Sequence, residues 1–325
     1  METITEFDLA YGTDQQCREY LVRKRWPDGK VTCTRCGSDR VFALKTRPFH
    51  WVCKSGAQVR DRKTGEVNEC HRRNGYRFSV TSGTIFDNTK IPLNTCFKVG
   101  YLMLTSKKGI SANQIHRIMF GEHTKHAYHT SWYICMRWRA AMAGDMYQPL
   151  QGIVEADETY IGGKDRNRHW NKKSAQVRAQ RGELAFGDEK FGYGKVGVIG
   201  AIERKGNVVA RVIGSQDAPT LSGFVRNVVS KKVSLVVTDE NRDYGHLGRD
   251  IKHETVTHSK NEWVRGEVHT NNIESFWSLI KRGVIGQYHH VSKKYLPFYL
   301  NEFSFRYNNR KNSEMFADLI TTCKQ

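Results

Sequence analysis

The stretch Gly152-Ile-Val-Glu-Ala-Asp-Glu-Thr-Tyr-Ile-Gly-Gly163 decides how the second half of the chain folds. It is a run of β-forming residues bounded by glycines, which predicts a strand. Because side chains alternate along a strand, we expect Glu155, Asp157 and Thr159 on one face and mostly apolar residues on the other. The strand therefore presents a polar row, in which Asp157 is a candidate catalytic residue.

The residues that follow predict further parts of the same sheet. Segments 196–202 and 208–213 flank a Lys-Gly-Asn turn and predict a hairpin, and a helix over 220–230 leads into a buried strand over 235–237. Asp239 comes just after that strand, at the strand end where α/β sheets place their chemistry. This order of elements predicts a mixed α/β sheet.

A helix predicted over residues 271–282 supplies a third acid. Its apolar stripe is Ile273, Phe276, Trp277 and Ile280, and its polar stripe is Asn271, Glu274, Ser278 and Lys281. Glu274 allows two interpretations, a capping box with Asn271 or a partner of the two aspartates. Three such carboxylates would suit two Mg²⁺ (or Mn²⁺) ions, which promote phosphoryl displacement.

Four cysteines in the N-terminal part predict a structural Zn²⁺ site. Cys33-Thr-Arg-Cys36 is a CxxC knuckle, and its distance to Cys53 fits the loop of a zinc ribbon. The next thiol is Cys70, so we expect a hairpin inserted between the third and fourth ligands. His71 and His50 remain alternative fourth ligands.

Helices are predicted between these two parts. Residues 14–25 read as a short helix, and the segment 92–142 has apolar residues at helical spacing. Two of its helices, joined through residues 121–129, are similar to a helix-turn-helix, and an ordinary helical bundle is the alternative. Arg137 and Arg139 lie in the second of these helices and are candidate DNA contacts.

The charge of the chain favours a polyanionic partner. The sequence has 52 Lys and Arg against 33 Asp and Glu, a formal net charge of +19. A mobile basic loop is expected over residues 164–195. No apolar run approaches the roughly 18 residues of a membrane span, and the first ten residues do not resemble a secretion signal, which predicts a cytoplasmic protein that uses no membrane.

In their order along the chain, these motifs resemble the ISXO-like insertion-sequence transposases of the DDE class. The resemblance extends from about Cys17 to Arg310. The stretches that carry it are Arg25 to Gly29, Cys33 to Cys36, Phe78 to Phe86, Glu155 to Gly163, Thr238-Asp239, His269 to Gly283, Gly286 to Ser292 and Tyr299 to Asn308.

The resemblance implies a zinc ribbon and helix-turn-helix region for recognition of the element ends, followed by a ribonuclease-H-like catalytic domain. It implies that Asp157, Asp239 and Glu274 bind the catalytic metal ions and that Lys281 contacts DNA near the cut. Asn271 and Asn272 remain alternatives for the third acidic position. Further candidate DNA contacts are Arg282, His269, Asn271 and Lys164.

The predicted function is therefore a transposase that cuts insertion-sequence ends and transfers them to target DNA. We expect a dimer or larger homo-oligomer on double-stranded DNA, associated with the bacterial nucleoid. Alternative functions are a metal-dependent nuclease or resolvase of the same fold, and a non-catalytic zinc/helix-turn-helix DNA-binding protein. The predicted parts are an N-terminal helix and turn (1–30), a zinc ribbon (31–90), a helix-turn-helix-like region (91–145), a catalytic domain (150–310) and a C-terminal helix (311–325).

Overall fold

The computed structural model describes residues 3–60, 65, 67–70, 75–121, 127–143, 148–162, 195–257, 259 and 264–323. The chain divides into two compact units. The first unit contains Met1–Ser106, Ala112–Met142 and Asn312–Gln325, and the second unit contains Lys107–Ser111 and Ala143–Lys311.

The second unit is built on a five-stranded mixed sheet with the order β10-β9-β6-β7-β8. Its strands are β6 (Leu150–Ile161), β7 (Val196–Glu203), β8 (Val208–Val212), β9 (Val229–Thr238) and β10 (His253–Thr255). The first three strands form an antiparallel meander, whereas β9 pairs in parallel with β6 and β10 in parallel with β9. The predicted mixed α/β sheet is thus confirmed, including the hairpin.

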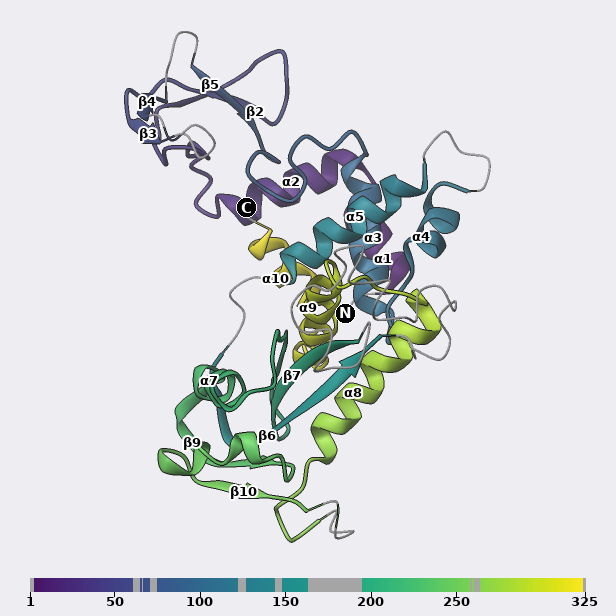
Figure 1. The fold of residues 1–325 in the computed structure, drawn as a ribbon. Helices are drawn as coiled ribbons and strands as arrows, with labels where there is room; N and C mark the ends of the chain where they lie inside the picture. The colour runs from purple at the N-terminus through teal and green to yellow at the C-terminus, as the bar shows by residue number, and fades with distance from the viewer. Residues whose placement is uncertain are drawn as a thin grey trace, which may run out of the picture. The chain divides into compact units, whose positions relative to one another are not determined.

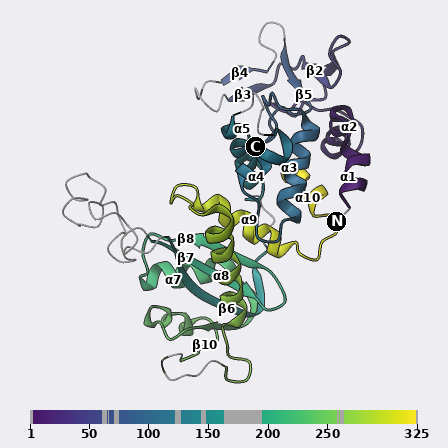
Figure 2. The same ribbon diagram turned by 90° about the vertical axis from the view of Figure 1, so that its right-hand side faces the viewer.

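Helices cover both faces of this sheet (Figures 1 and 2). Helix α7 (Ala218–Val228) packs its apolar side chains against one face of the sheet, in a core cluster that includes Val154 and Ala156 of β6. Helices α8 (Asn271–Gly283) and α9 (Leu296–Asn308) pack against the other face. The alternation predicted for β6 is confirmed, because Glu155 and Asp157 point toward α8 and bond residues of that helix.

The first unit contains the cysteine-rich ribbon. Strands β1 (Val41–Ala43), β2 (His50–Cys53) and β5 (Tyr76–Ser79) form an antiparallel sheet. A separate antiparallel pair, β3 (Gln58–Arg60) and β4 (Val67–Glu69), lies between Cys53 and Cys70 in sequence. This pair confirms the hairpin expected between the third and fourth cysteines, and its turn lies outside the described residues.

Helices make up the rest of the first unit: α1 (Ile4–Tyr11), α2 (Asp14–Arg25), α3 (Leu93–Thr105), α4 (Ala112–Met119), α5 (Tyr128–Ala141) and α10 (Met315–Thr322). Helix α2 has the predicted bounds. The core is aromatic, with Phe316 of α10 packed against Phe7, Phe97 and Trp138. Helices α4 and α5 are tied by a 3.2 Å contact between His116 Nδ1 and Ser131 Oγ, and residues 122–126 of their connection lie outside the described residues.

Short helical turns also occur among the described residues of the second unit. They are η3 (Arg242–Tyr244), η4 (Leu247–Arg249) and a π-helical turn, η6 (Val284–Tyr288), which continues α8. In the part of the chain that the structure describes, no helix has the length and apolar character to cross a membrane.

Candidate active site and zinc site

The strand register places two of the predicted acids side by side. In the parallel pair of β6 and β9, Glu155 lies opposite Val237. Continuing that register by two residues brings Asp157 beside Asp239, which follows the end of β9. Parallel neighbouring strands are about 4.8 Å apart, so two like charges face each other at this point of the sheet.

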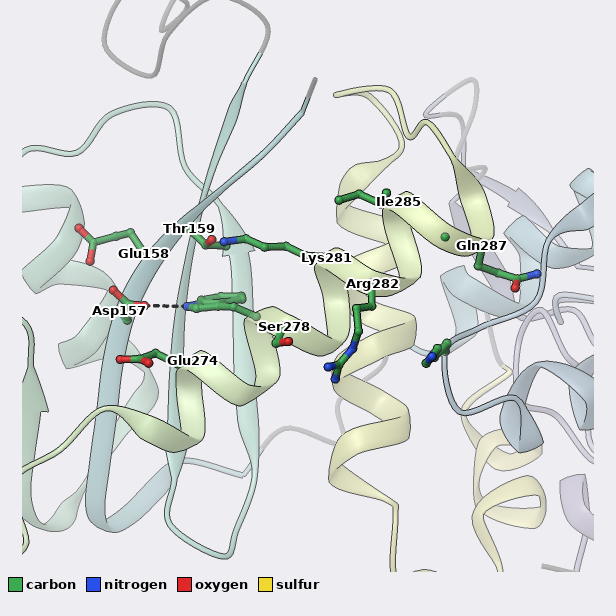
Figure 3. A pocket seen from close by; sticks show the side chains of 12 residues that line it. Asp157, Glu158, Thr159, Glu274, Ser278, Lys281, Arg282, Ile285 and Gln287 are labelled. Carbon is green, nitrogen blue, oxygen red and sulfur yellow. Dashed lines mark hydrogen bonds between the residues drawn. The ribbon is translucent and has the colours of Figure 1, made fainter. Parts of the chain in front are cut away.

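Trp277 of α8 fixes one oxygen of Asp157. Its indole Nε1–H donates a 3.0 Å hydrogen bond to Asp157 Oδ2 (Figure 3). The ring reaches that position over Gly200, the residue of β7 directly opposite Asp157, where a Cβ atom would lie only 2.5 Å from the indole. The sequence indicated Trp277 as a core residue. The structure shows that it is also a polar partner of Asp157.

Glu274 lies on α8, one turn before Ser278 and on the same side of the pocket as Asp157 (Figure 3). The helix begins differently from the predicted capping box, because its N-cap is Thr270 and Asn271 is already helical. The Thr270 hydroxyl donates to Glu274 Oε1 at 2.8 Å. One oxygen of Glu274 is therefore held by the start of its own helix.

Glu155 attaches α8 to strand β6. Its fully buried carboxylate accepts hydrogen bonds from the backbone N–H groups of Asn272 and Ile273, at 2.8 and 3.2 Å. The side chains of Asn272 and Arg204 bind the other oxygen at 2.7 and 2.9 Å. A carboxylate at a helix N-terminus satisfies unpaired amides and interacts favourably with the helix dipole. This network fixes where Glu274 lies relative to Asp157.

Glu158, on the opposite face of β6, attaches the loop after β9. It accepts hydrogen bonds from the Tyr244 hydroxyl and from Asn241 Nδ2, the latter at 2.9 Å. The backbone N–H of Asn241 in turn donates to Asp239 Oδ1 at 3.1 Å. Sequence analysis missed Glu155 and Glu158 as organising residues. The only available signal was the density of acids in Glu155-Ala-Asp-Glu158.

Burial, and then repulsion between neighbouring acids, raises the pKa values of Asp157 and Glu158. Burial, followed by the nearby charge of Asp239, raises the pKa of Asp157 to about 7. The pKa of Glu158 is also raised to about 7, by burial and then by repulsion from Asp239 and Asp157 despite its hydrogen bond from Tyr244. Without a cation, this edge of the sheet therefore resists full ionisation.

The carboxylates open into a pocket of about 820 Å³ whose other wall is cationic. Asp157, Glu158 and Glu274 line one end (Figure 3). Lys281 and Arg282 of α8 and Lys108, all exposed, are among the residues that line the rest of it. The predicted polar stripe of α8 is confirmed from Glu274 to Lys281, because Glu274, Ser278 and Lys281 all face this pocket.

The other predicted DNA contacts lie in different environments. His269 places Nδ1 3.3 Å from Glu155 Oε1, whereas Asn271 is exposed at the start of α8. Arg137 donates to the carbonyl oxygens of Ile85 and Asp87, and Arg139 is 1% exposed. Lys164 and nearly all of the expected basic loop lie outside the described residues.

The four cysteines converge as a zinc site requires. Their sulfur atoms all lie within 4.8 Å of one another, with separations of 3.7 Å for Cys33–Cys70, 3.7 Å for Cys36–Cys53 and 3.8 Å for Cys53–Cys70. A tetrahedral Zn²⁺ with Zn–S bonds of about 2.3 Å needs S···S separations of about 3.8 Å. The donor set therefore fits a structural Zn²⁺, with Cys70 in the fourth position.

His50, one of the alternatives, is outside this cluster and contacts the carbonyl of Pro48, while His71 lies outside the described residues. Among the residues described, the four cysteines are the group of three or more His, Cys, Asp or Glu side chains whose ligand atoms lie close enough together to hold one metal ion.

Comparisons with known proteins agree with this architecture. Residues 149–308 match the family model of the ISXO2-like transposase domain, and residues 12–56 match the transposase zinc-ribbon domain. A Halobacterium salinarum protein described as an uncharacterized protein in transposable element ISH50 is 26% identical over 305 residues, covering 91% of this chain and 92% of that protein.

Among solved structures, a cryo-EM structure of the simian T-cell lymphotropic virus intasome in complex with PP2A regulatory subunit B56 gamma aligns at 10% identity with a TM-score of 0.28. The alignment covers 65% of this chain and 65% of that chain, slightly under two thirds, and a score this low carries no conclusion about fold.

The two family matches together cover more than half of the chain; one includes the first part of the ribbon, with Cys33, Cys36 and Cys53, and the other includes the five-stranded sheet. The protein thus has the two-part construction of a transposase. It belongs to the ISXO2-like transposase family, as the motifs from Glu155 to Gly283 indicated.

Proposed function

We propose that this protein cuts DNA at the ends of an insertion sequence and joins the freed ends to target DNA, using Asp157, Asp239 and Glu274 as its acidic triad. The observation that carries the proposal is the burial of Asp157 close to Asp239, which together raise the pKa of Asp157 to about 7, at the end of a pocket that Glu274 and a cationic wall also line. Perturbed carboxylates in a pocket are typical of functional sites.

The strand arrangement supports a ribonuclease-H-like catalytic domain. The sheet has an antiparallel meander of β6, β7 and β8, and two further strands, β9 and β10, lie in parallel on the β6 side. Asp157 is on the first strand, and Asp239 comes just after the fourth. Such a domain needs this arrangement to bring two aspartates together. The family match over residues 149–308 covers these same elements.

The donor set suits a hard divalent cation such as Mg²⁺ or Mn²⁺. Carboxylate oxygens are the ligands such ions prefer, and a cation would offset the repulsion between Asp157 and Asp239. When bound, the ions would activate the attacking oxygen and stabilise the leaving oxygen of the phosphodiester.

The remaining residues would hold DNA and orient the acids. Lys281 and Arg282 would bind backbone phosphates on the cationic wall, while Trp277 keeps one oxygen of Asp157 directed and Glu155 holds α8 in place. Lys164, His269 and Asn271 stay candidate contacts. A side chain as buried as Arg139 offers nothing to a phosphate, so it is omitted from the proposed contacts.

The first unit would recognise the element ends. The elements proposed for this role are its zinc ribbon and the helix-turn-helix-like pair of α4 and α5, with Arg137 on α5 as a candidate DNA contact. Joining two ends requires them to be held together, which supports a homo-oligomer on DNA. The net charge of +19 supports association with the nucleoid.

The test uses the purified protein, Mg²⁺ or Mn²⁺, and linear DNA carrying the sequences that flank its own gene. We expect joined products from the wild-type protein and a loss of at least about a hundredfold with Glu274→Gln, which removes a ligand charge but keeps the shape. The surface variant Glu254→Gln is the matched control and retains joining.

The outcomes separate the alternatives. Cutting without joining would support the nuclease or resolvase. End binding with no reaction in wild type, and no change in Glu274→Gln, would support the non-catalytic DNA-binding protein and would exclude the proposed triad.

A further inference from the structure

An apolar side chain lies exposed in the charged pocket. Ile285 is 70% exposed, belongs to the π-helical turn Val284–Tyr288, and lines the pocket together with Gly286 and Gln287. Figure 3 shows it beyond Lys281, away from the carboxylate end. An isoleucine this exposed contributes nothing to the core. Single-turn π-helices interrupt α-helices frequently at functional sites.

The start of the turn is rigidly anchored. Gly283, the last residue of α8, packs so closely against the Phe303 ring and the Lys108 carbonyl oxygen that a Cβ atom at this position would clash with both. Val284 is buried in the core formed by α8, α9 and the sheet. The chain therefore enters the turn from a fixed point.

The end of the turn is anchored as well. The Tyr288 hydroxyl donates to Glu302 Oε1 at 3.0 Å, and its ring packs edge-on against Tyr299 with centroids 4.7 Å apart. Gly109 leaves the space that this ring occupies. The next residue, His289, has φ +58°, a left-handed backbone that non-glycine residues seldom adopt. The turn is thus fixed at both ends while Ile285 projects between them.

The charges around Ile285 indicate the kind of ligand. Lys281, Arg282 and Lys108 line the same pocket, so an anionic backbone can pass along it from the acids toward the turn. An aliphatic side chain beside cations that bind phosphates can pack against the face of a base that is no longer stacked on its neighbours. DNA-binding proteins insert Ile, Leu, Met or Phe between base steps in this way.

We propose that Ile285 packs against an unstacked base of the DNA strand next to the bond that is cut. This inference rests on the proposed function and adds a subsite to it. The base would leave the duplex because its neighbouring phosphates are held by Lys281 and Arg282 while the fixed turn occupies its stacking position. Unstacking a base has a free-energy cost, which contact with Ile285 partly offsets.

The test measures the base directly in the absence of divalent ions. Duplexes carrying the element end contain 2-aminopurine, whose fluorescence rises on unstacking, at one of the positions flanking the cut. We expect a rise at one position with wild-type protein, and most of that rise lost in Ile285→Ala together with a roughly tenfold weaker binding. Ile285→Leu retains both.

Val264→Ala is the matched control, because Val264 is an aliphatic residue of the same unit, 53% exposed and outside the pocket. It should bind and unstack like wild type. Equal 2-aminopurine signals for wild type and Ile285→Ala would overturn the inference, as would no rise at any position. A change in oligomeric state of Ile285→Ala without DNA would also overturn it, because Ile285 would then contact a second copy of the chain.

The two proposals fail separately. If wild type joins DNA ends but the fluorescence does not depend on Ile285, the subsite is wrong and the transposase function stands. If no joining occurs under any metal condition, the proposed function fails whatever the fluorescence shows.

Discussion

The two candidate metal sites of this protein are constructed in opposite ways. The thiols of the ribbon come from one short stretch, with Cys33 and Cys70 only 37 residues apart, and they already lie at the spacing of zinc ligands. The acids of the second unit come from two strands and a helix, and Asp157 meets its partner Trp277 across 120 residues. The first site is nearly closed, and the second is open and charged.

The difference shows what each site needs from the fold. Soft thiolates bound to one ion make a closed tetrahedral site, in which the metal itself supplies folding energy. A catalytic site must keep positions free for a substrate, so its ligands cannot be held by the metal alone. Here other acids hold the surrounding elements in place: Glu155 binds the start of α8, and Glu158 binds the loop after β9.

The largest expected effect is on the ribbon. Removing zinc with a chelator, or replacing Cys70 by Ser, should unfold the ribbon and leave the second unit folded, because zinc contributes about 10–16 kcal/mol to small zinc domains. Zinc content measured by atomic absorption and hydrogen exchange over residues 31–60 would report this. The matched control is Cys135→Ser, a buried cysteine outside the cluster, which keeps its zinc. A Cys70→Ser protein that binds zinc as tightly as wild type would show that another residue is the fourth ligand.

The second effect is on the acid that anchors α8. Glu155→Ala leaves Arg204 and the helix amides without their buried partner, and we expect a loss of about 3–5 kcal/mol in unfolding free energy. Urea denaturation would measure it. Glu254→Ala removes an exposed partner of Arg265 and should cost less than about 1 kcal/mol. Similar losses from both substitutions would mean that α8 is held by its apolar stripe alone.

The smallest effect concerns pH in the metal-free protein. The folded state raises the pKa of Asp157 to about 7, so the protonated form is favoured by folding. The stability from this preference is fully present below the pKa of the unfolded chain, near 4, and is lost as the pH rises through about 7. Asn does not ionise, so the Asp157→Asn protein does not lose this stability as the pH rises. The unfolding free energy of Asp157→Asn should therefore increase relative to that of wild type by on the order of 1–3 kcal/mol between pH 5 and pH 8.

Denaturation at four pH values in a chelating buffer would follow this change. Addition of Mg²⁺ at pH 8 should stabilise wild type and not Asp157→Asn. An advantage that does not vary with pH would indicate that Asp157 ionises freely in the folded protein.

Much of this architecture could be read from the chain. Helix α2, the hairpin of β7 and β8, the apolar stripe of α8 and the hairpin between Cys53 and Cys70 all follow from local spacing. The predicted range of α8, 271–282, also agrees with the observed Asn271–Gly283, but the N-cap is Thr270 rather than Asn271. Local signals do not distinguish these two residues, because both have a polar side chain that can cap a helix.

The sequence by itself determined the zinc ribbon and the mixed sheet, because short spacings and periodicities are set by neighbouring residues, and the resemblance of its motifs indicated the transposase family. Only the tertiary structure decided that Glu155 and Glu158 organise the acids, that Trp277 bonds Asp157 over Gly200, and that Ile285 is exposed in the pocket. Each of these depends on atoms that are distant in sequence. Their positions follow from strand register and helix packing, which no single segment encodes.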